Sequence, residues 1–297
     1  MIRILGTIFA GLLGLAFGSF LNVCLSRWPE GESVVSPRSH CRNCEHALAW
    51  WENIPLVSWL ILRGRCRNCR AAISWRYPLV EFAVGLLWAS LAWLLLTGPW
   101  DPESTTFDYI FAVQFVLGRA VLYWLLIALA MFDAECLWLP DLITLPGIAL
   151  GFIFTVVEFV GFRHDSTDAF EAVRFGIYGA ILQRVLGILA AAALILLIRW
   201  LYKLIRHQEG LGLGDAKLMA MLAAWLGLPG ALLAFALGAI LGSLAALVLL
   251  AIPNARTNPQ SWATSKLPFG TFLCIGGVVS SLWGQPLIAA YLRWAGF

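Results

Sequence analysis

Long apolar segments divide the sequence, and they constrain its fold more than any other feature. A helix needs roughly 20 mostly apolar residues to cross the hydrocarbon core of a bilayer. Charged residues make up only 12% of the chain, too few to cover the surface of a water-soluble domain. The sequence therefore predicts an all-α polytopic protein in a lipid bilayer. About eight transmembrane helices are expected, over residues 4–25, 77–96, 109–132, 142–160, 176–200, 215–228, 230–252 and 269–291.

Lysine and arginine residues are distributed unevenly around these spans. Cytoplasmic segments of membrane proteins carry an excess of both residues. If the N-terminus lies outside, fourteen of them fall on the cytosolic side and four on the opposite side. We therefore expect both termini outside the cell membrane and the long polar segment between the first two spans in the cytosol. The net charge of +3 is too small to predict nucleic-acid binding.

The polar segment, residues 26–76, contains two Cys-Arg-Asn-Cys motifs separated by 21 residues. Each motif offers two thiolates on one tight turn, a pattern typical of a closed, structural zinc site. The alternative is that the four cysteines form two disulfides or remain free thiols. A reducing cytosol disfavours the disulfides. The predicted zinc ligands are Cys41, Cys44, Cys66 and Cys69. The other three cysteines, Cys24, Cys136 and Cys274, are expected to pack as small apolar side chains.

Two aspartates are the strongest candidates for chemistry. Asp133 ends the third span and Asp215 begins the sixth, so both are expected at the same membrane face. Two carboxyl groups brought close share a proton, so that one activates water while the other polarises a carbonyl, as in aspartic proteases. Gly212 and Gly214 precede Asp215 and would let a peptide approach it. Alternatively, Asp215 only caps its helix and Asp133 pairs with Lys217 or another cation.

These motifs together resemble type IV prepilin peptidases, the bifunctional leader peptidase/N-methyltransferases. Besides the cysteine motifs, the similar segments are residues 18–23, 52–58, 73–81, 139–141, 212–217 and 268–270. The resemblance implies that Asp133 and Asp215 are catalytic, and that Gly212, Gly214 and Lys217 form and support the GxGD motif. It also divides the chain into a first helix (1–25), a zinc insert associated with methylation (26–76) and a peptidase domain (77–297).

The resemblance further implies a substrate, a cofactor and a location. Members of the family cleave the basic leader of prepilins and pseudopilins after a glycine, at the cytosolic face of the bacterial inner membrane, with both termini periplasmic. They then methylate the new N-terminus with S-adenosylmethionine. No cofactor ligands follow from the sequence, although Glu81 and polar insert residues are candidates; a buried pair with an insert arginine is the alternative for Glu81. Thr271 stands where the family often has proline, a change not expected to touch a catalytic position.

Two other functional classes remain open at this point. A transporter could use Asp133 and Asp215 to bind a cation or relay protons, although both lie at one membrane face and no inverted repeat is evident. A zinc-containing scaffold of a secretion system, without enzymatic activity, is the third possibility. The oligomeric state does not follow from the sequence.

Overall fold

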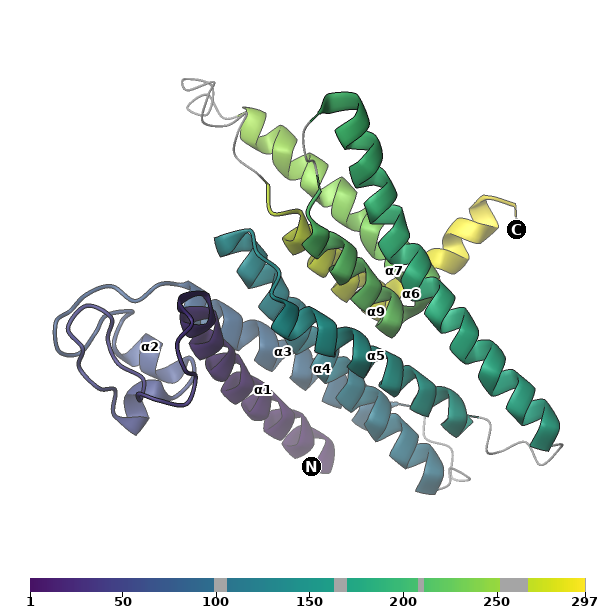
Figure 1. Ribbon diagram of the computed structural model, residues 1–297. Helices are drawn as coiled ribbons and strands as arrows, with labels where there is room; N and C mark the ends of the chain where they lie inside the picture. Colours follow the sequence, from purple (N-terminus) through teal and green to yellow (C-terminus); the bar gives the residue numbers. More distant parts are fainter. Residues whose placement is uncertain (99–105, 163–169, 208–210, 252–266, 297) are drawn as a thin grey trace. The chain divides into compact units, whose positions relative to one another are not determined.

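The chain folds into helices joined by short connections and one irregular insert. The computed structural model describes residues 1–98, 106–162, 170–207, 211–251 and 267–296. Within these ranges there are no strands, only two isolated bridges. Seven helices are long and apolar enough to cross a membrane, which confirms the all-α, multi-pass architecture. They are α1 (Ile2–Arg27), α3 (Arg76–Thr97), α4 (Thr106–Cys136), α5 (Asp141–Phe162), α6 (Phe170–Arg206), α7 (Leu213–Ala251) and α9 (Phe269–Trp294) (Figure 1).

Helix α7 accounts for the difference between these seven helices and the eight predicted. It includes residues 215–228 and most of 230–252, which the sequence assigned to two separate spans. The helix is kinked at Gly227, whose φ of 75° and ψ of 169° are not helical. Glycine tolerates a positive φ, and Pro229 has no backbone N–H to continue the hydrogen-bond ladder. The predicted break is therefore real: α7 consists of two helices that meet at Gly227, in agreement with the two predicted spans.

The described chain clusters into two compact units, Met1–Ala128 and Leu129–Phe297, with α4 passing from the first to the second. In the first unit, α1 and α3 lie side by side (Figure 1). A Cβ atom added to Gly14 would lie 2.9 Å from Cα of Gly85, and one added to Gly18 would lie 2.7 Å from Cα of Glu81. Small residues thus allow the two backbones to approach closely, as in many membrane helix pairs.

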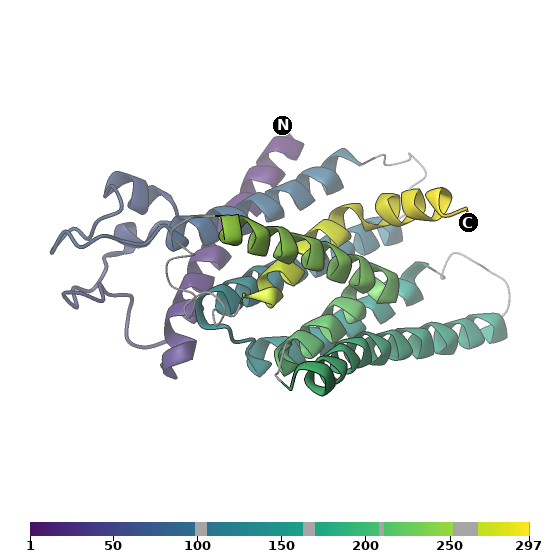
Figure 2. The same ribbon diagram turned by 90° about the horizontal axis from the view of Figure 1, so that it is seen from above.

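The insert joins α1 to α3 within the first unit. It contains the short helices η1 (Trp28–Glu30), η2 (Trp50–Asn53) and α2 (Val57–Ile61), and the rest is loop. It forms a separate lobe beside α1 and α3 in both ribbon views (Figure 2). So small a lobe has little apolar core of its own, and it needs other interactions to hold its shape.

In the second unit, α7 packs against both α5 and α9. Helix α7 packs on α5 through Trp225, whose indole N–H donates to the carbonyl of Gly147 at 2.9 Å. It packs on α9 through Gly238, where a Cβ atom would lie 3.0 Å from Cα of Leu273. These close contacts hold α7 against α5 and α9, and the first turns of α7 and α9 carry residues of the candidate catalytic site.

Candidate catalytic and metal sites

Asp133 lies near the end of α4, and only 6% of its surface is exposed. Its Oδ2 atom accepts a hydrogen bond from the backbone N–H of Thr271 at 2.7 Å, and the Thr271 hydroxyl lies 3.2 Å from the same oxygen. Thr271 is the third residue of α9, where a backbone N–H has no partner within the helix. The expectation that Thr271 does not touch a catalytic position is therefore wrong. The two residues are 138 positions apart, so no local pattern revealed the contact.

Gly270 lets the start of α9 approach Asp133. A Cβ atom at this position would lie 3.0 Å from both Cγ and Oδ2 of Asp133 and 3.2 Å from Cδ1 of Leu139. Real Cβ atoms rarely come so close to a neighbour, because overlap at this distance is repulsive. The Pro-Phe-Gly segment before Thr271 therefore presents its backbone to the carboxylate.

Asp215 lies in the first turn of α7 and is 8% exposed. Its Oδ2 atom accepts a hydrogen bond from the backbone N–H of Gly212 at 2.9 Å. A Cβ atom on Gly214 would lie 3.0 Å from Cβ of Leu139, so the GxGD segment packs tightly on that residue. Gly210, which begins the predicted glycine-rich run, lies outside the described residues, as do Arg163, Arg256 and Lys266 of the charge count.

The structure brings the two predicted aspartates together in the second unit. Their carboxylates interact electrostatically with each other, and both act on the buried thiol of Cys274 in α9. Leu139 contacts the positions of Gly214 and Gly270, one beside each aspartate. Lys217 is not the ion-pair partner of Asp133, which was the alternative left open by the sequence. Its Nζ atom lies 2.5 Å from Oδ1 of Asp141, the first residue of α5.

The four cysteines of the insert form a compact cluster. Their sulfur atoms all lie within 4.8 Å of one another, with Sγ of Cys41 3.8 Å from that of Cys69 and Sγ of Cys44 4.0 Å from that of Cys66. Tetrahedral zinc with Zn–S bonds of about 2.3 Å places its sulfur ligands about 3.8 Å apart. All seven cysteines are free thiols, so the disulfide alternative is not what the structure contains. The cluster therefore has the geometry to bind a metal.

The remaining cysteines follow the sequence prediction only in part. Cys24 and Cys274 are buried, as expected for small apolar side chains. Cys136 is exposed at the last residue of α4, so the prediction that it packs in the interior is wrong. The end of a helix offers few neighbours, which the position of Cys136 in the sequence did not reveal.

The two cysteine motifs have the same local structure. In each, a backbone N–H returns to the first cysteine's carbonyl, from Glu45 to Cys41 and from Arg70 to Cys66. Each motif also donates a side-chain amide hydrogen bond to a cysteine of the other motif. Nδ2 of Asn43 lies 3.6 Å from Sγ of Cys69, and Nδ2 of Asn68 lies 3.6 Å from Sγ of Cys44.

These contacts favour the thiolate form of Cys69. The backbone N–H of Ala71 and the amide of Asn43 lower the pKa of the Cys69 thiol to about 6. Donors that point at sulfur stabilise its negative charge, and the thiolate is the form that binds metal. The repeated asparagines are thus candidate residues of the metal site that the sequence analysis did not single out, although their equivalent positions in the two motifs were a visible signal.

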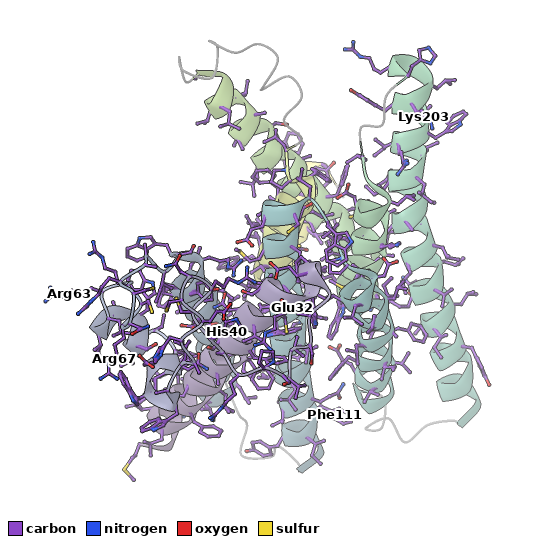
Figure 3. All side chains as sticks on the ribbon, turned by 60° about the vertical axis from the view of Figure 1, so that its left-hand side comes forward. Glu32, His40, Arg63, Arg67, Phe111 and Lys203 are labelled. Atoms are coloured by element: carbon purple, nitrogen blue, oxygen red, sulfur yellow. The ribbon has the colours of Figure 1, made fainter. Side chains whose placement is uncertain are left out.

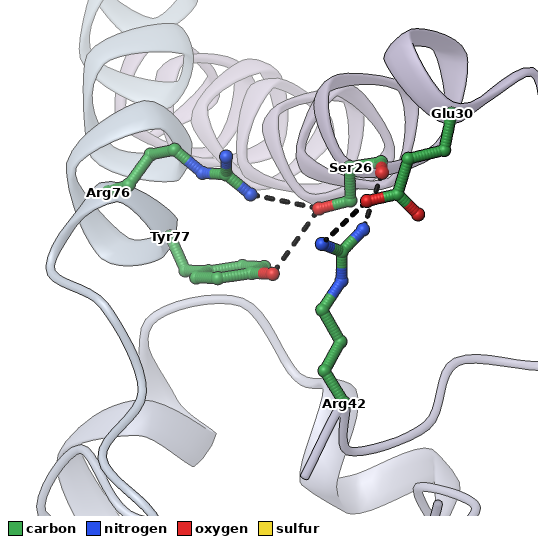
Figure 4. Close-up of polar contacts among 5 residues, drawn as sticks. All are labelled: Ser26, Glu30, Arg42, Arg76 and Tyr77. Atoms are coloured by element: carbon green, nitrogen blue, oxygen red, sulfur yellow. Dashed lines mark hydrogen bonds and ion pairs between the residues drawn. The ribbon is translucent and has the colours of Figure 1, made fainter. Parts of the chain in front are cut away.

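A cavity of about 710 Å³ lies between the insert and the adjoining ends of α1 and α3, all within the first unit. A hydrogen-bond network closes one side of it: the Arg76 guanidinium donates to Oγ of Ser26, and Arg42 donates to the carbonyl of Ser26 and pairs with Glu30 (Figure 4). Tyr77 lies 3.3 Å from the same Ser26 hydroxyl. The network ties the insert to both helices.

Two buried oxygen atoms on this cavity have no hydrogen-bond partner among the described residues. They are Oδ1 of Asn22, in α1, and Oε1 of Glu52, in η2. The other carboxylate oxygen of Glu52 accepts the backbone N–H of Ala49 at 2.8 Å. Glu81, a predicted candidate, also lines the cavity and accepts the N–H of Leu56 at 2.8 Å. Sequence analysis missed Asn22 and included Glu52 only among the polar insert residues, because nothing local marks an acceptor that lacks a donor in three dimensions.

Comparison with protein families matches both parts of the chain. Residues 12–95 match the bacterial peptidase A24 N-terminal domain, and residues 120–247 match the type IV leader peptidase family. Prepilin leader peptidase/N-methyltransferases of Stutzerimonas stutzeri and Pseudomonas aeruginosa are 33% and 34% identical, each over 96% of this chain and 93% of the relative. The protein of that name from Aeromonas hydrophila is 33% identical over 95% of this chain and 92% of the relative.

The chain belongs to the type IV leader peptidase family. It is therefore a member of an enzyme family, which removes the non-enzymatic scaffold from consideration. The match to the A24 N-terminal domain includes the four cysteines and Glu52. The match to the type IV leader peptidase family includes Asp133 and Asp215. No solved structure gives a significant match to the chain.

Proposed function

We propose that this enzyme cleaves the leader of type IV prepilins and pseudopilins and then methylates the new N-terminal residue. Two separate sites support the proposal: the paired aspartates in the second unit, and the cysteine cluster with its neighbouring cavity in the first. The observation that carries the peptidase half is that Asp133 and Asp215 are both buried, interact with each other and receive backbone N–H donors.

The peptidase reaction needs both aspartates in different protonation states. The ionised carboxylate removes a proton from water, whose oxygen attacks the carbonyl carbon of the scissile bond after glycine. The protonated partner donates a hydrogen bond to the carbonyl oxygen as negative charge develops there. Backbone N–H groups from Gly212 and Thr271 hold the two side chains, and the absence of a side chain at Gly214 lets the GxGD segment pack against Leu139.

We assign structural zinc to Cys41, Cys44, Cys66 and Cys69. Four thiolate ligands fill a tetrahedral shell and leave no open position, so the metal would hold the insert together without activating water. The insert consists of loops and short helices, which makes a metal staple the expected source of much of its folding energy.

We assign S-adenosylmethionine to the cavity beside the insert. Its volume of about 710 Å³ is within the range of sites for ligands of this size. The unpartnered oxygens of Asn22 and Glu52 only accept hydrogen bonds, whereas the cofactor carries an amino group, hydroxyls and an exocyclic amine as donors. When bound, the cofactor supplies an electrophilic methyl group. The roles of this chain's residues are to bind and orient it, with the buried charge of Glu52 favouring a cation.

A binding measurement tests the cofactor assignment without relying on turnover. We expect S-adenosylhomocysteine to bind the purified protein in calorimetry, and Glu52→Gln to weaken binding about tenfold or more, because a hydrogen bond to a charged group is lost. Asp133→Asn, in the second unit, is the matched control and should bind normally. Unchanged affinity in Glu52→Gln would remove Glu52 from the site.

We place the protein in the inner membrane with both termini in the periplasm and both active sites on the cytosolic side. The basic residues of the insert support this orientation, and several are exposed, with Arg63 and Arg67 at the outer edge of the lobe (Figure 3). A prepilin carries its positive leader on the cytosolic side, so its scissile bond would reach the aspartates there.

Mass spectrometry of a purified prepilin incubated with this enzyme and S-adenosylmethionine tests the whole proposal. The expected product lacks the leader and carries one additional methyl group at its new N-terminus. An intact prepilin after incubation with folded, zinc-containing enzyme would contradict the proposal and favour the transporter alternative, which proton flux in proteoliposomes would then measure.

A further inference from the structure

The hydroxyl of Thr271 lies between two oxygen atoms with different capacities. Its Oγ1 atom is 3.2 Å from Oδ2 of Asp133 and 2.9 Å from the backbone carbonyl of Ala130. The carbonyl can only accept a hydrogen bond, whereas a carboxyl oxygen accepts when ionised and donates when protonated. A hydroxyl group has one proton, so it can donate to only one of these neighbours at a time.

This arrangement fits both protonation states of Asp133. When Asp133 is ionised, the hydroxyl proton points to Oδ2, beside the backbone N–H that already binds the same oxygen. When Oδ2 carries a proton, that proton points to Oγ1 of Thr271, and the hydroxyl turns its own proton to the carbonyl of Ala130. Rotation of one O–H bond is sufficient, and no heavy atom has to move.

A buried carboxyl group that changes its protonation state needs a hydrogen-bond partner in each state, because an unsatisfied buried polar group is costly. Only 6% of Asp133 is exposed. The other titratable groups that interact with it among the described residues are Asp215 and Cys274, whereas the hydrogen bonds to Oδ2 come from the N–H and the hydroxyl of Thr271.

We propose that Thr271 is a positioning residue that holds Asp133 through the proton transfers of leader cleavage. The inference rests on the proposed peptidase function and deepens it. Proline at this position would have neither a hydroxyl nor a backbone N–H. The double contact to Asp133 therefore requires a residue with both a backbone N–H and a side-chain hydroxyl.

Two substitutions of Thr271 distinguish the effect of its hydroxyl from the effect of its side-chain shape. Thr271→Val keeps the branched shape and the backbone N–H but removes the hydroxyl, whereas Thr271→Ser keeps the hydroxyl. We expect Val to lower kcat for leader cleavage about 10- to 100-fold with little change in KM, since the neighbours of the hydroxyl are Asp133 and the carbonyl of Ala130. It should also displace at least one limb of the pH profile by about half a unit or more. Ser should restore kcat to within about threefold of wild type.

Two results would overturn the inference. One is wild-type kcat and pH profile in Thr271→Val, and the other is an equal loss in Val and Ser, which would assign the effect to packing. Thermal unfolding confirms that each variant is folded, and Thr271→Ala gives the same comparison if Val is unstable. Asp133→Asn in the same assay keeps the two proposals apart: an active Asp133→Asn overturns the peptidase assignment itself, whereas an inactive one with a normal Thr271→Val overturns only the role of Thr271.

Discussion

Gly270 lies so close to Asp133 that a Cβ atom on the glycine would be 3.0 Å from the carboxylate oxygen Oδ2. Asp133 is held on the same side by the N–H of Thr271, so the carboxylate has little freedom to move away. Leu139, 3.2 Å from the same Cβ position, closes a second direction. The first turn of α9 thus determines where the Asp133 carboxylate can sit.

Gly270→Ala should therefore lower leader cleavage strongly while leaving the protein folded. Displacing a catalytic group by about 1 Å can cost on the order of 100-fold in rate, and we expect a loss of this size in kcat. Gly179→Ala is the matched control, because a Cβ atom at Gly179 has no neighbour within 4 Å. Equal cleavage by the two alanine variants would show that the carboxylate position tolerates the methyl group.

Lys217 and Asp141 should stabilise the second unit only modestly. Their side chains are 38% and 58% exposed, and exposed ion pairs contribute roughly 0.2–1 kcal/mol. A double-mutant cycle with Lys217→Met and Asp141→Asn should give a coupling in this range for thermal unfolding in detergent. Strictly additive effects would indicate that the contact between α5 and α7 contributes no interaction energy.

The insert should contain about one zinc ion per chain, measured by elemental analysis of the purified protein. Cys41→Ser should lose most of this metal, and a strong chelator should make the wild-type insert sensitive to proteolysis, because metal binding and folding of such a segment are coupled. Cys136→Ser is the control, since this exposed cysteine lies outside the cluster, and its metal content should match wild type. Retention of zinc by Cys41→Ser would exclude Cys41 as a ligand.

Asn43 and Asn68 should tune the metal site from outside the ligand set. Each donates an amide N–H to a cysteine of the other motif at 3.6 Å. Removing such outer contacts typically weakens metal binding about 10- to 100-fold. Competition with a chromogenic chelator should show this loss in Asn43→Ala and Asn68→Ala, but not in Asn53→Ala. Equal zinc affinity in all three variants would mean that the amide contacts are incidental.

Features with a local signature were predictable from the sequence. The apolar segments predicted the helices, because length and composition decide whether a segment spans a bilayer. The repeated Cys-x-x-Cys motif predicted the cluster, because its spacing places two sulfur atoms on one turn. Asp133 and Asp215 were selected because charged groups at helix ends in a membrane are few.

Features that depend on tertiary contacts were not predictable. Thr271 contacts Asp133 across 138 residues, and Lys217 pairs with Asp141 where the sequence left Asp133 as its alternative partner. The missing donors at Asn22 and Glu52 became visible only when the insert was placed on the ends of α1 and α3.

The central claim is that cleavage occurs at Asp133 and Asp215, whereas methylation occurs at the separate site beside the insert. Intact-mass analysis of two substrates tests it directly: a full prepilin, and a peptide that already begins at the mature N-terminus. For Asp133→Asn and Asp215→Asn we predict that prepilin cleavage falls about 10³-fold or more, because the two carboxyl groups act as a unit. Both variants should still methylate the mature peptide at the wild-type rate. Leader cleavage near the wild-type rate in either variant would contradict the account.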